Sequence, residues 1–220
     1  MKRLIHCVVF VVLAASISSI VLAREPGPDE VRSMVPALIP VAEKACSDVT
    51  ARPGISAHGI DHAAVEALSD IAKLDQQKQV PAIRARLAEL QTQIGEIDTL
   101  PLLSLHFLLG YLAGNEGNTR QQAYHRAYAI ALTQVMERNG TGKTPAQAIR
   151  PCLVANEYDW LKFRANLGQP NSQGLQSAGD RLYDVMRLAG PDGKKIAIYF
   201  DVTQMMEQTE RNLESKPGKP

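Results

Sequence analysis

The chain has 220 residues, and its 24 lysines and arginines nearly balance 23 aspartates and glutamates, for a formal net charge of +1. Binding to nucleic acid needs a basic face that neutralises phosphates, and Lys and Arg gather nowhere beyond the short run Gly193–Lys195. The composition therefore excludes a nucleic-acid partner. The length suits one or two small domains with a buried core.

The N-terminus has the pattern of a secretory signal peptide. Lys2 and Arg3 precede an apolar run at Val8–Ala15, and small residues end at Ala23, where a signal peptidase would cut. Serines between residues 16 and 19 leave fewer than the ~18 unbroken apolar residues that a membrane-spanning helix needs. We therefore predict a signal peptide at residues 1–23, a periplasmic or secreted protein, and contact with the membrane only through the transient signal.

Residues 24–139 have the periodicity of a helical bundle. The first segment is helical in composition, but Pro36 and Pro40 predict a break in it. The short links between later segments favour antiparallel neighbours. The expected helical segments are Asp29–Ala45, His62–Leu74 with Val65, Leu68 and Ala72 on one side, Pro81–Ile97 with a stripe at Ile83, Leu87, Leu90, Ile94 and Ile97, an all-round apolar helix at Leu100–Asn115, and Thr119–Arg138 with Thr119 as N-cap.

The stretch "NGTGKT" at Asn139–Thr144 ends like a phosphate-binding loop. That loop needs a glycine five positions before Gly142, where this chain has Glu137, and it needs a strand before it and a helix after it. Here a predicted helix precedes it, so we expect no nucleotide binding. Glycines that end one helix, with Thr144 and Pro145 beginning the next segment, explain the same residues.

Residues 140–214 predict a small α+β part, and residues 215–220 a disordered tail. Two apolar segments flank the turn residues "GPDG", so Arg181–Val202 should be a β-hairpin. Arg150–Ala155 is rich in strand formers and would supply a third strand, while Asn156–Gly168 returns to helical spacing and a last helix follows Thr203. The fold class is therefore α+β, with the helical bundle first.

This second half resembles a known family. The succession "GTGKTPAQAI", "VANEYDWL", "SQGL", "LYDVMRL" and "IYFDV", spanning about residues 140–202, is similar to a family of uncharacterised secreted bacterial proteins classed as a domain of unknown function. The resemblance implies a helical part before a small α+β part, and an exported, periplasmic protein of bacterial origin. It assigns no catalytic residue to any position of this chain.

Two cysteines, Cys46 and Cys152, remain after removal of the signal that contains Cys7. An even number of cysteines in an exported chain is compatible with a disulfide, and equally with two separately buried thiols. The sequence leaves both alternatives open. It has no Cys-x-x-Cys pair, which argues against a thiol oxidoreductase.

Two sets of residues have the types needed for catalysis. His58 and His62 flank Asp61 in "HGIDH", a spacing that could serve Zn²⁺, but the motif lacks a glutamate base, and Gly59 favours a loop with Asp61 as helix N-cap. The carboxylates of the second half could share acid and base roles, and they are Glu157, Asp159, Asp184 and Asp201. Ser172 lacks a nucleophile-elbow setting. We therefore expect no catalytic, metal or cofactor site.

Three classes of function remain. The first is a non-enzymatic binding or accessory protein that takes a protein or peptide partner in the bundle, or in its groove with the hairpin part. The second is a hydrolase that uses the His/Asp motif or the carboxylates. The third is a structural module associated with the cell envelope. Fold class alone cannot separate them, because function depends on sites.

The signal-peptide hypothesis predicts that the exported protein begins at Arg24. N-terminal sequencing of protein recovered from the exporting host would test this. Recovery of an exported chain that still begins at Met1 would contradict it.

Overall fold

The computed structural model describes residues 25–51, 55–76, 79–190 and 192–214. The expected signal peptide, its cleavage site before Arg24 and the tail at residues 215–220 lie outside these ranges. The fold is α+β: helices come first, and a three-stranded antiparallel sheet follows. Across the described ranges, every helix is too short or too polar to cross a bilayer.

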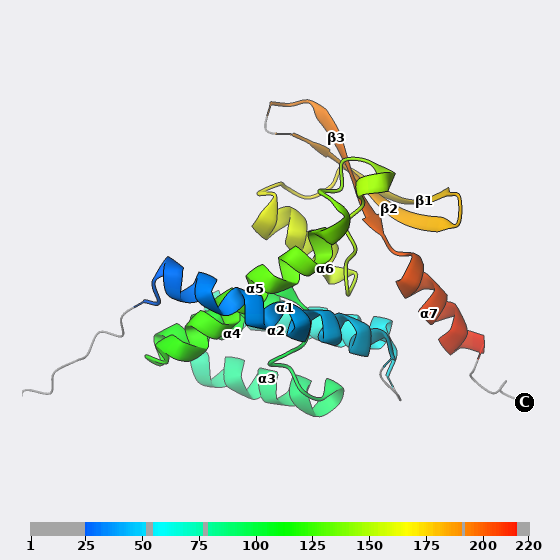
Figure 1. Cartoon of the computed structure of the whole chain (residues 1–220). Helices are drawn as coiled ribbons and strands as arrows, with labels where there is room; N and C mark the ends of the chain where they lie inside the picture. Colours follow the sequence, from blue (N-terminus) through cyan, green and yellow to red (C-terminus); the bar gives the residue numbers. More distant parts are fainter. Residues whose placement is uncertain (1–24, 52–54, 77–78, 191, 215–220) are drawn as a thin grey trace, which may run out of the picture.

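The first half consists of five helices that pack as neighbouring pairs. Helix α1 lies along α5, α4 and α5 form one antiparallel hairpin, and α2 and α3 form another (Figure 1). The helices are α1 (Pro28–Ala51), α2 (Ala57–Gln76), α3 (Val80–Ile94), α4 (Leu103–Asn115) and α5 (Thr119–Met136).

Helix α1 is continuous, so the break predicted at its prolines was wrong. Pro36 and Pro40 both lie on the exposed face of α1, where carbonyls left without a helical donor can bond to water. The opposite face is buried against α5 through Val31, Val35 and Leu38. Packing of this face outweighs the local cost of the two prolines.

Helix α2 begins earlier than predicted and buries a different face. It starts at Ala57, where the Ser56 hydroxyl accepts a hydrogen bond from the Gly59 amide at 3.1 Å. Gly59 and Asp61 therefore lie inside the helix, and Asp61 is not its N-cap. The buried stripe is Ile60, Ala64, Ala67 and Ile71, whereas Val65 is exposed. Two stripes are available in this sequence, and the one rich in alanine allows the closer approach to neighbouring helices.

The other helices follow their patterns more closely. The apolar stripe of α3 is buried as predicted, and the helix ends at Gly95, whose φ of 82° suits glycine. The N-cap of α5 is Asn118 and not Thr119, because the Asn118 side chain accepts from the Gln121 amide at 3.1 Å.

The predicted hairpin is confirmed, and its two strands are β2 (Arg181–Ala189) and β3 (Lys195–Asp201). The third strand is not Arg150–Ala155, which has no strand structure beyond an adjoining single bridge from Ile149 to Phe200. It is β1 (Ser172–Ala178), which pairs with β2 through a two-residue turn at Gly179 and Asp180. Polar β1 lacks the apolar alternation that predicts strands, so the turn at Gly179 and Asp180 is its only clear feature in the sequence.

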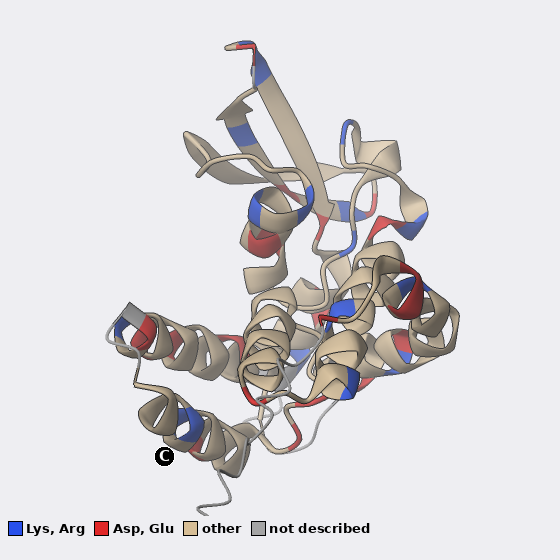
Figure 2. Cartoon of the chain, turned by 90° about the vertical axis from the view of Figure 1, so that its left-hand side faces the viewer, with Lys and Arg blue, Asp and Glu red and all other residues tan. Residues whose placement is uncertain are grey.

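The connecting segments carry short helices. They are η1 (Glu137–Asn139), η2 (Pro145–Gln147), α6 (Ala155–Asp159) and the π-helical turn η3 (Trp160–Arg164), and the chain ends with α7 (Thr203–Glu214). In Figure 1 the sheet and α6 lie above the helices, and α7 runs away from the sheet toward the C-terminus. In Figure 2 the basic and acidic residues, coloured along the ribbon, are interspersed.

Two large hydrophobic clusters form most of the core, and a small third one on the sheet joins Ala148, Tyr183 and Val185. The larger joins α1 and α5 to the sheet, with Phe200 fully buried and edge-on to Trp160 at 6.0 Å between ring centroids. The smaller joins α2, α3 and α4, and Leu153 from the segment before α6 completes it. The larger cluster therefore crosses residue 140, where the helical part meets the α+β part.

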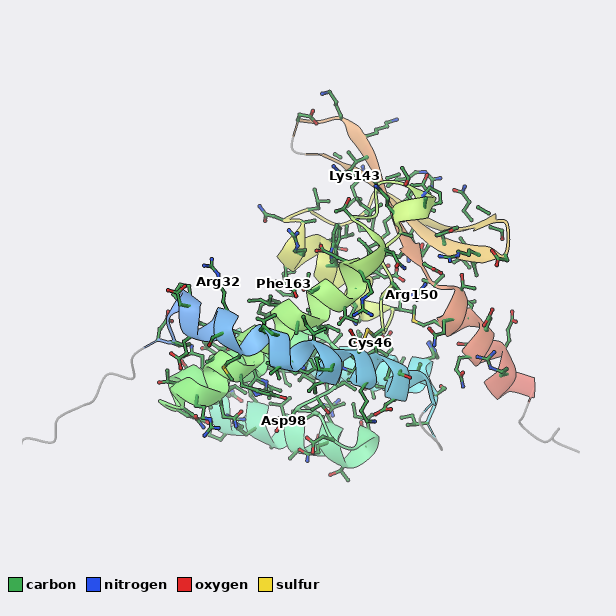
Figure 3. All side chains as sticks on the ribbon, viewed as in Figure 1. Arg32, Cys46, Asp98, Lys143, Arg150 and Phe163 are labelled. Carbon is green, nitrogen blue, oxygen red and sulfur yellow. A yellow bond between two sulfur atoms is a disulfide. The ribbon has the colours of Figure 1, made fainter. Side chains whose placement is uncertain are left out.

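Cys46 and Cys152 form a disulfide, with their Cα atoms 4.9 Å apart. Figure 3 shows Cys46 on α1 below Arg150. Cys152 lies in the connection before α6, and not in a strand at Arg150–Ala155 as the sequence predicts. The bond thus fastens α1 to the segment that enters the α+β part.

We predict that removing this disulfide lowers the free energy of unfolding. It closes a loop with a sequence separation of 106 residues, which corresponds to a stabilisation of up to about 4.7 kcal/mol in the chain-entropy model. Denaturant unfolding of the double variant Cys46→Ser, Cys152→Ser measures the loss. Thiol titration of denatured, unreduced protein that starts at Arg24 should find no thiol, and two titratable thiols would contradict the bond.

Candidate functional site

The "NGTGKT" segment packs against β3 as a loop. Helix α5 and η1 precede it and the short η2 follows, so the strand and long helix of a phosphate loop are not its neighbours here. The Gly142 amide donates to Gln147 O at 2.7 Å, and the Gly142 carbonyl accepts from the Tyr199 amide at 2.8 Å. A Cβ at Gly142 would lie 2.9 Å from Ile149 and Ile198. The glycine is therefore required by contact with the sheet.

A cavity of about 170 Å³ lies where α2, α6, the sheet and α7 meet, and three carboxyl groups line it. Its mouth includes Val154 and Leu175, which are 38% and 59% exposed. Four of the candidate residues named from the sequence meet here, although they come from three distant segments: His58, Asp61, Glu157 and Asp184. We call this the carboxyl cavity. Its other lining residues are Ala57, Leu153, Val202, Met205, Met206 and Thr209.

Glu157 is the most unusual residue of the carboxyl cavity. It lies on α6 with no exposed surface, and neither of its carboxyl oxygens accepts from an N–H or hydroxyl group of the described residues. Burial, then the charge of Asp184, a hydrogen bond between the Glu157 and Asp184 carboxyl groups, and the charge of Asp61 raise the pKa of Glu157 well above its ordinary value. Buried polar groups in folded proteins are almost always paired, so this side chain marks a candidate binding site.

Asp184 faces the same cavity from β2. The Gln173 side-chain amide donates to one of its oxygens, and Gln173 accepts in turn from the Tyr158 hydroxyl. The other carboxyl oxygen of Asp184 is buried and accepts from no N–H or hydroxyl group of the described residues, and the Asp184 side chain is hydrogen-bonded to the Glu157 carboxyl. The chain of hydrogen bonds through Gln173 holds Asp184 beside Glu157.

Asp61 supplies the third carboxyl group. Its Oδ1 accepts from the Ala155 amide at 2.9 Å, so α2 caps the first turn of α6. Burial raises the pKa of Asp61, and the Ala155 hydrogen bond and the neighbouring His58 and His62 partly offset that rise. Exposed His58 lies three residues earlier on α2, at the edge of the carboxyl cavity.

The remaining candidates have structural partners. Asp159 accepts from the Ser104 amide at 2.7 Å, and Asn156 accepts from the Leu103 amide at 3.2 Å, so α6 caps the N-terminus of α4. Asp201 pairs with two arginines, at 3.5 Å from Arg150 and 3.2 Å from Arg181.

The other sequence motifs form no chemical site. His62 lines a shallow hollow on the outer face of α2, and Ser172 is exposed on β1. Within the described ranges, His, Cys, Asp and Glu side chains form no group of three or more that could hold a metal ion.

A second buried polar pair lies in the helical part, at His106 and His125. His106 is a hydrogen-bonded core residue, and His125 is buried beside it. The His106 Nε2 donates to Leu100 O at 2.8 Å, so its Nδ1 accepts from His125 Nδ1 at 3.1 Å. Burial lowers the pKa of His106 to about 3. The His106 ring is therefore neutral near pH 7, and burial also lowers the pKa of His125.

Comparisons of the chain with protein-family models, with curated proteins and with solved structures found no match. The carboxyl cavity and the chemistry of its residues are therefore the basis for a proposed function.

We predict that Glu157→Gln stabilises the unliganded protein at neutral pH. Because folding raises the pKa of Glu157, its contribution to stability is complete below the ordinary glutamate pKa and is lost as pH rises toward the folded-state pKa. Each unit of that rise costs about 1.4 kcal/mol at high pH. Glutamine has the shape of the protonated acid and avoids this loss.

Urea unfolding at pH 4 and pH 7 tests this prediction. The variant should match the wild type at pH 4 and exceed it at pH 7. Glu66→Gln, on the exposed face of α2, removes the same charge outside the carboxyl cavity and is the control. A variant that is less stable than the wild type at pH 7 would contradict the prediction.

Proposed function

We propose that this chain is a non-enzymatic exported binding protein whose carboxyl cavity holds an alkylammonium group, such as the lysine side chain of a protein or peptide partner. The observation that carries the proposal is the buried carboxyl pair of Glu157 and Asp184, three of whose oxygens accept from no N–H or hydroxyl group of the described residues.

The chemistry of the carboxyl cavity favours an organic cation. An ammonium group offers three donors, which match the unpaired oxygens of Glu157 and Asp184. Apolar side chains line the rest of the wall, among them Leu153, Met205 and Met206, and these suit an aliphatic stem. A buried charge in such a setting needs a partner of opposite sign, and a bound cation would supply it.

The size of the carboxyl cavity favours one side chain over a whole substrate. Sites for drug-sized ligands usually enclose about 300 to 1,000 Å³, and this cavity encloses about 170 Å³. A single side chain held here would leave the rest of the partner on the surface. This supports a protein or peptide as the partner, with no cofactor or nucleotide.

A hydrolase is the second candidate, favoured by the raised pKa of Glu157 beside Asp184. A general acid and a carboxylate base are often tuned in this way. The described residues place no serine, cysteine or histidine within hydrogen-bonding distance of Glu157, and the small cavity limits the substrate. Turnover of a substrate that Glu157→Gln abolishes without unfolding the chain would favour this candidate.

Export is part of the proposal. The signal pattern at residues 1–23 supports it. The Cys46–Cys152 bond also supports it, because disulfides persist in oxidising compartments such as the periplasm. If no cation binds, the structural module associated with the cell envelope becomes the favoured alternative.

The test is calorimetric titration with n-butylamine, which reproduces the end of a lysine side chain. We expect a dissociation constant on the order of millimolar, as suits so small a ligand. Since Glu157 must lose its proton to pair with the ammonium, binding should release protons at any pH below the raised pKa of Glu157 and tighten as pH rises toward it. Titrations in two buffers with different heats of ionisation measure that release.

Variants assign the binding to the carboxyl cavity. Glu157→Gln and Asp184→Asn should each weaken binding roughly tenfold or more, because hydrogen bonds to charged groups contribute about 1.5 to 3 kcal/mol. Glu66→Gln should bind as the wild type does. Equal binding by the wild type and Glu157→Gln, or no binding at all, would contradict the proposal.

A further inference from the structure

One edge of the sheet is bare and the other is covered. The chain itself lies along β3: the Tyr199 amide donates to Gly142 O at 2.8 Å, and the Asp201 amide donates to Ile149 O at 2.7 Å. At the opposite edge, β1 pairs only with β2 among the described segments. All seven residues of β1 are exposed.

The sequence of β1 lacks the usual protection of an edge strand. Proteins guard such edges with charged residues, proline or bulges, because unpaired backbone groups pair with other chains. Strand β1 reads "SQGLQSA" and contains neither a charged residue nor proline. Its pairing with β2 runs without interruption from Ser172 to Ala178. The edge therefore presents a regular row of backbone donors and acceptors.

The bare edge is continuous with the carboxyl cavity. Leu175 lies at the middle of β1, is 59% exposed and lines the cavity. Its partner across the strands is Asp184, so the two side chains share one face of the sheet. Gln173, two residues earlier on the same face, donates to Asp184. A chain added to β1 would thus run along the cavity mouth.

We propose that the partner binds as an extended peptide that adds a fourth strand to the free edge of β1 and places a lysine side chain in the carboxyl cavity. This inference rests on the proposed function and names the form of the ligand. Backbone hydrogen bonds to β1 would supply affinity, and the cavity would select the lysine.

The geometry and charge support this occupant. Neighbouring strands lie about 4.8 Å apart, so a peptide on β1 would run roughly 10 Å from β2, which carries Asp184. The flexible four-carbon stem of lysine can cross above Leu175 toward Asp184 and Glu157. The acidic cavity favours a basic peptide, and a second copy of uncharged β1 would bring no cation to it.

The experiment uses a capped seven-residue peptide of alternating threonine and valine with one central lysine, titrated into the full mature chain. The added backbone hydrogen bonds predict binding roughly tenfold or more tighter than that of n-butylamine. Replacing the lysine by norleucine should remove most of the affinity. Glu157→Gln should weaken the peptide and n-butylamine alike, and Glu66→Gln should weaken neither.

N-methylated peptides test strand addition directly. Alternate N–H groups of a strand point to opposite edges, so methylating one alternate set should abolish binding, while methylating the other set should leave it unchanged. Equal behaviour of the two methylated peptides would overturn the proposed pairing with β1.

The remaining outcomes separate the two proposals. If n-butylamine binds and the peptide binds no tighter, the edge inference fails and the cation site stands. If neither binds, the proposed function fails as well. A stable dimer of the peptide-free chain in sedimentation experiments would show a second copy on the edge and overturn the peptide as its occupant.

Discussion

The short segment from Ile149 to Asp159 is the constraint on which the rest of the structure depends. It begins by bridging to β3 at Phe200, and Cys152 then bonds to α1. Further along, the Ala155 amide donates to Asp61 on α2, and Asp159 accepts from the amide of Ser104 at the start of α4. One stretch of chain therefore fastens the sheet to three helices.

This fastening also explains why a carboxyl group is buried. Helix α6 is held at both ends, because Asp61 caps its first turn and its own Asn156 and Asp159 cap α4. With those two residues turned toward α4, Glu157 between them is directed toward β2 and α7. The buried carboxyl of Glu157 is thus held by the same contacts that join the two halves.

The sequence predicts elements where local periodicity and packing agree. The stripe of α3 and the hairpin of β2 and β3 were predicted because their apolar residues recur with one period and one burial face. The continuity of α1 was not predicted, because burial of Val31, Val35 and Leu38 outweighs the local cost of the prolines on the opposite face. Strand β1 carries almost no apolar residue, and only the turn at Gly179 and Asp180 signalled it.

The carboxyl cavity could be predicted only in part. Its residue types were recognised in the sequence, at His58, Asp61, Glu157 and Asp184. Their meeting depends on long-range contacts between α2, α6 and β2, which no spacing in the sequence encodes. Asp159 and Asp201 have the same residue type and similar positions, yet they serve as a cap and an ion-pair partner. The difference is that the fold supplies hydrogen-bond or ion-pair donors to Asp159 and Asp201 but, among the described residues, none to Glu157.

Two buried groups give the stability of this protein opposite dependences on pH. Folding lowers the pKa of His106 to about 3, so its contribution to stability is complete above the ordinary histidine pKa and is lost as pH falls below it. Folding raises the pKa of Glu157, so its contribution is complete at low pH and is lost as pH rises. A bound cation would pair with ionised Glu157 and remove the second loss, while the histidine pair in the distant α4–α5 hairpin would be unaffected. The loss of stability that ionised Glu157 brings toward high pH is thus the one that the proposed cation would remove, so binding and stability would be linked through Glu157.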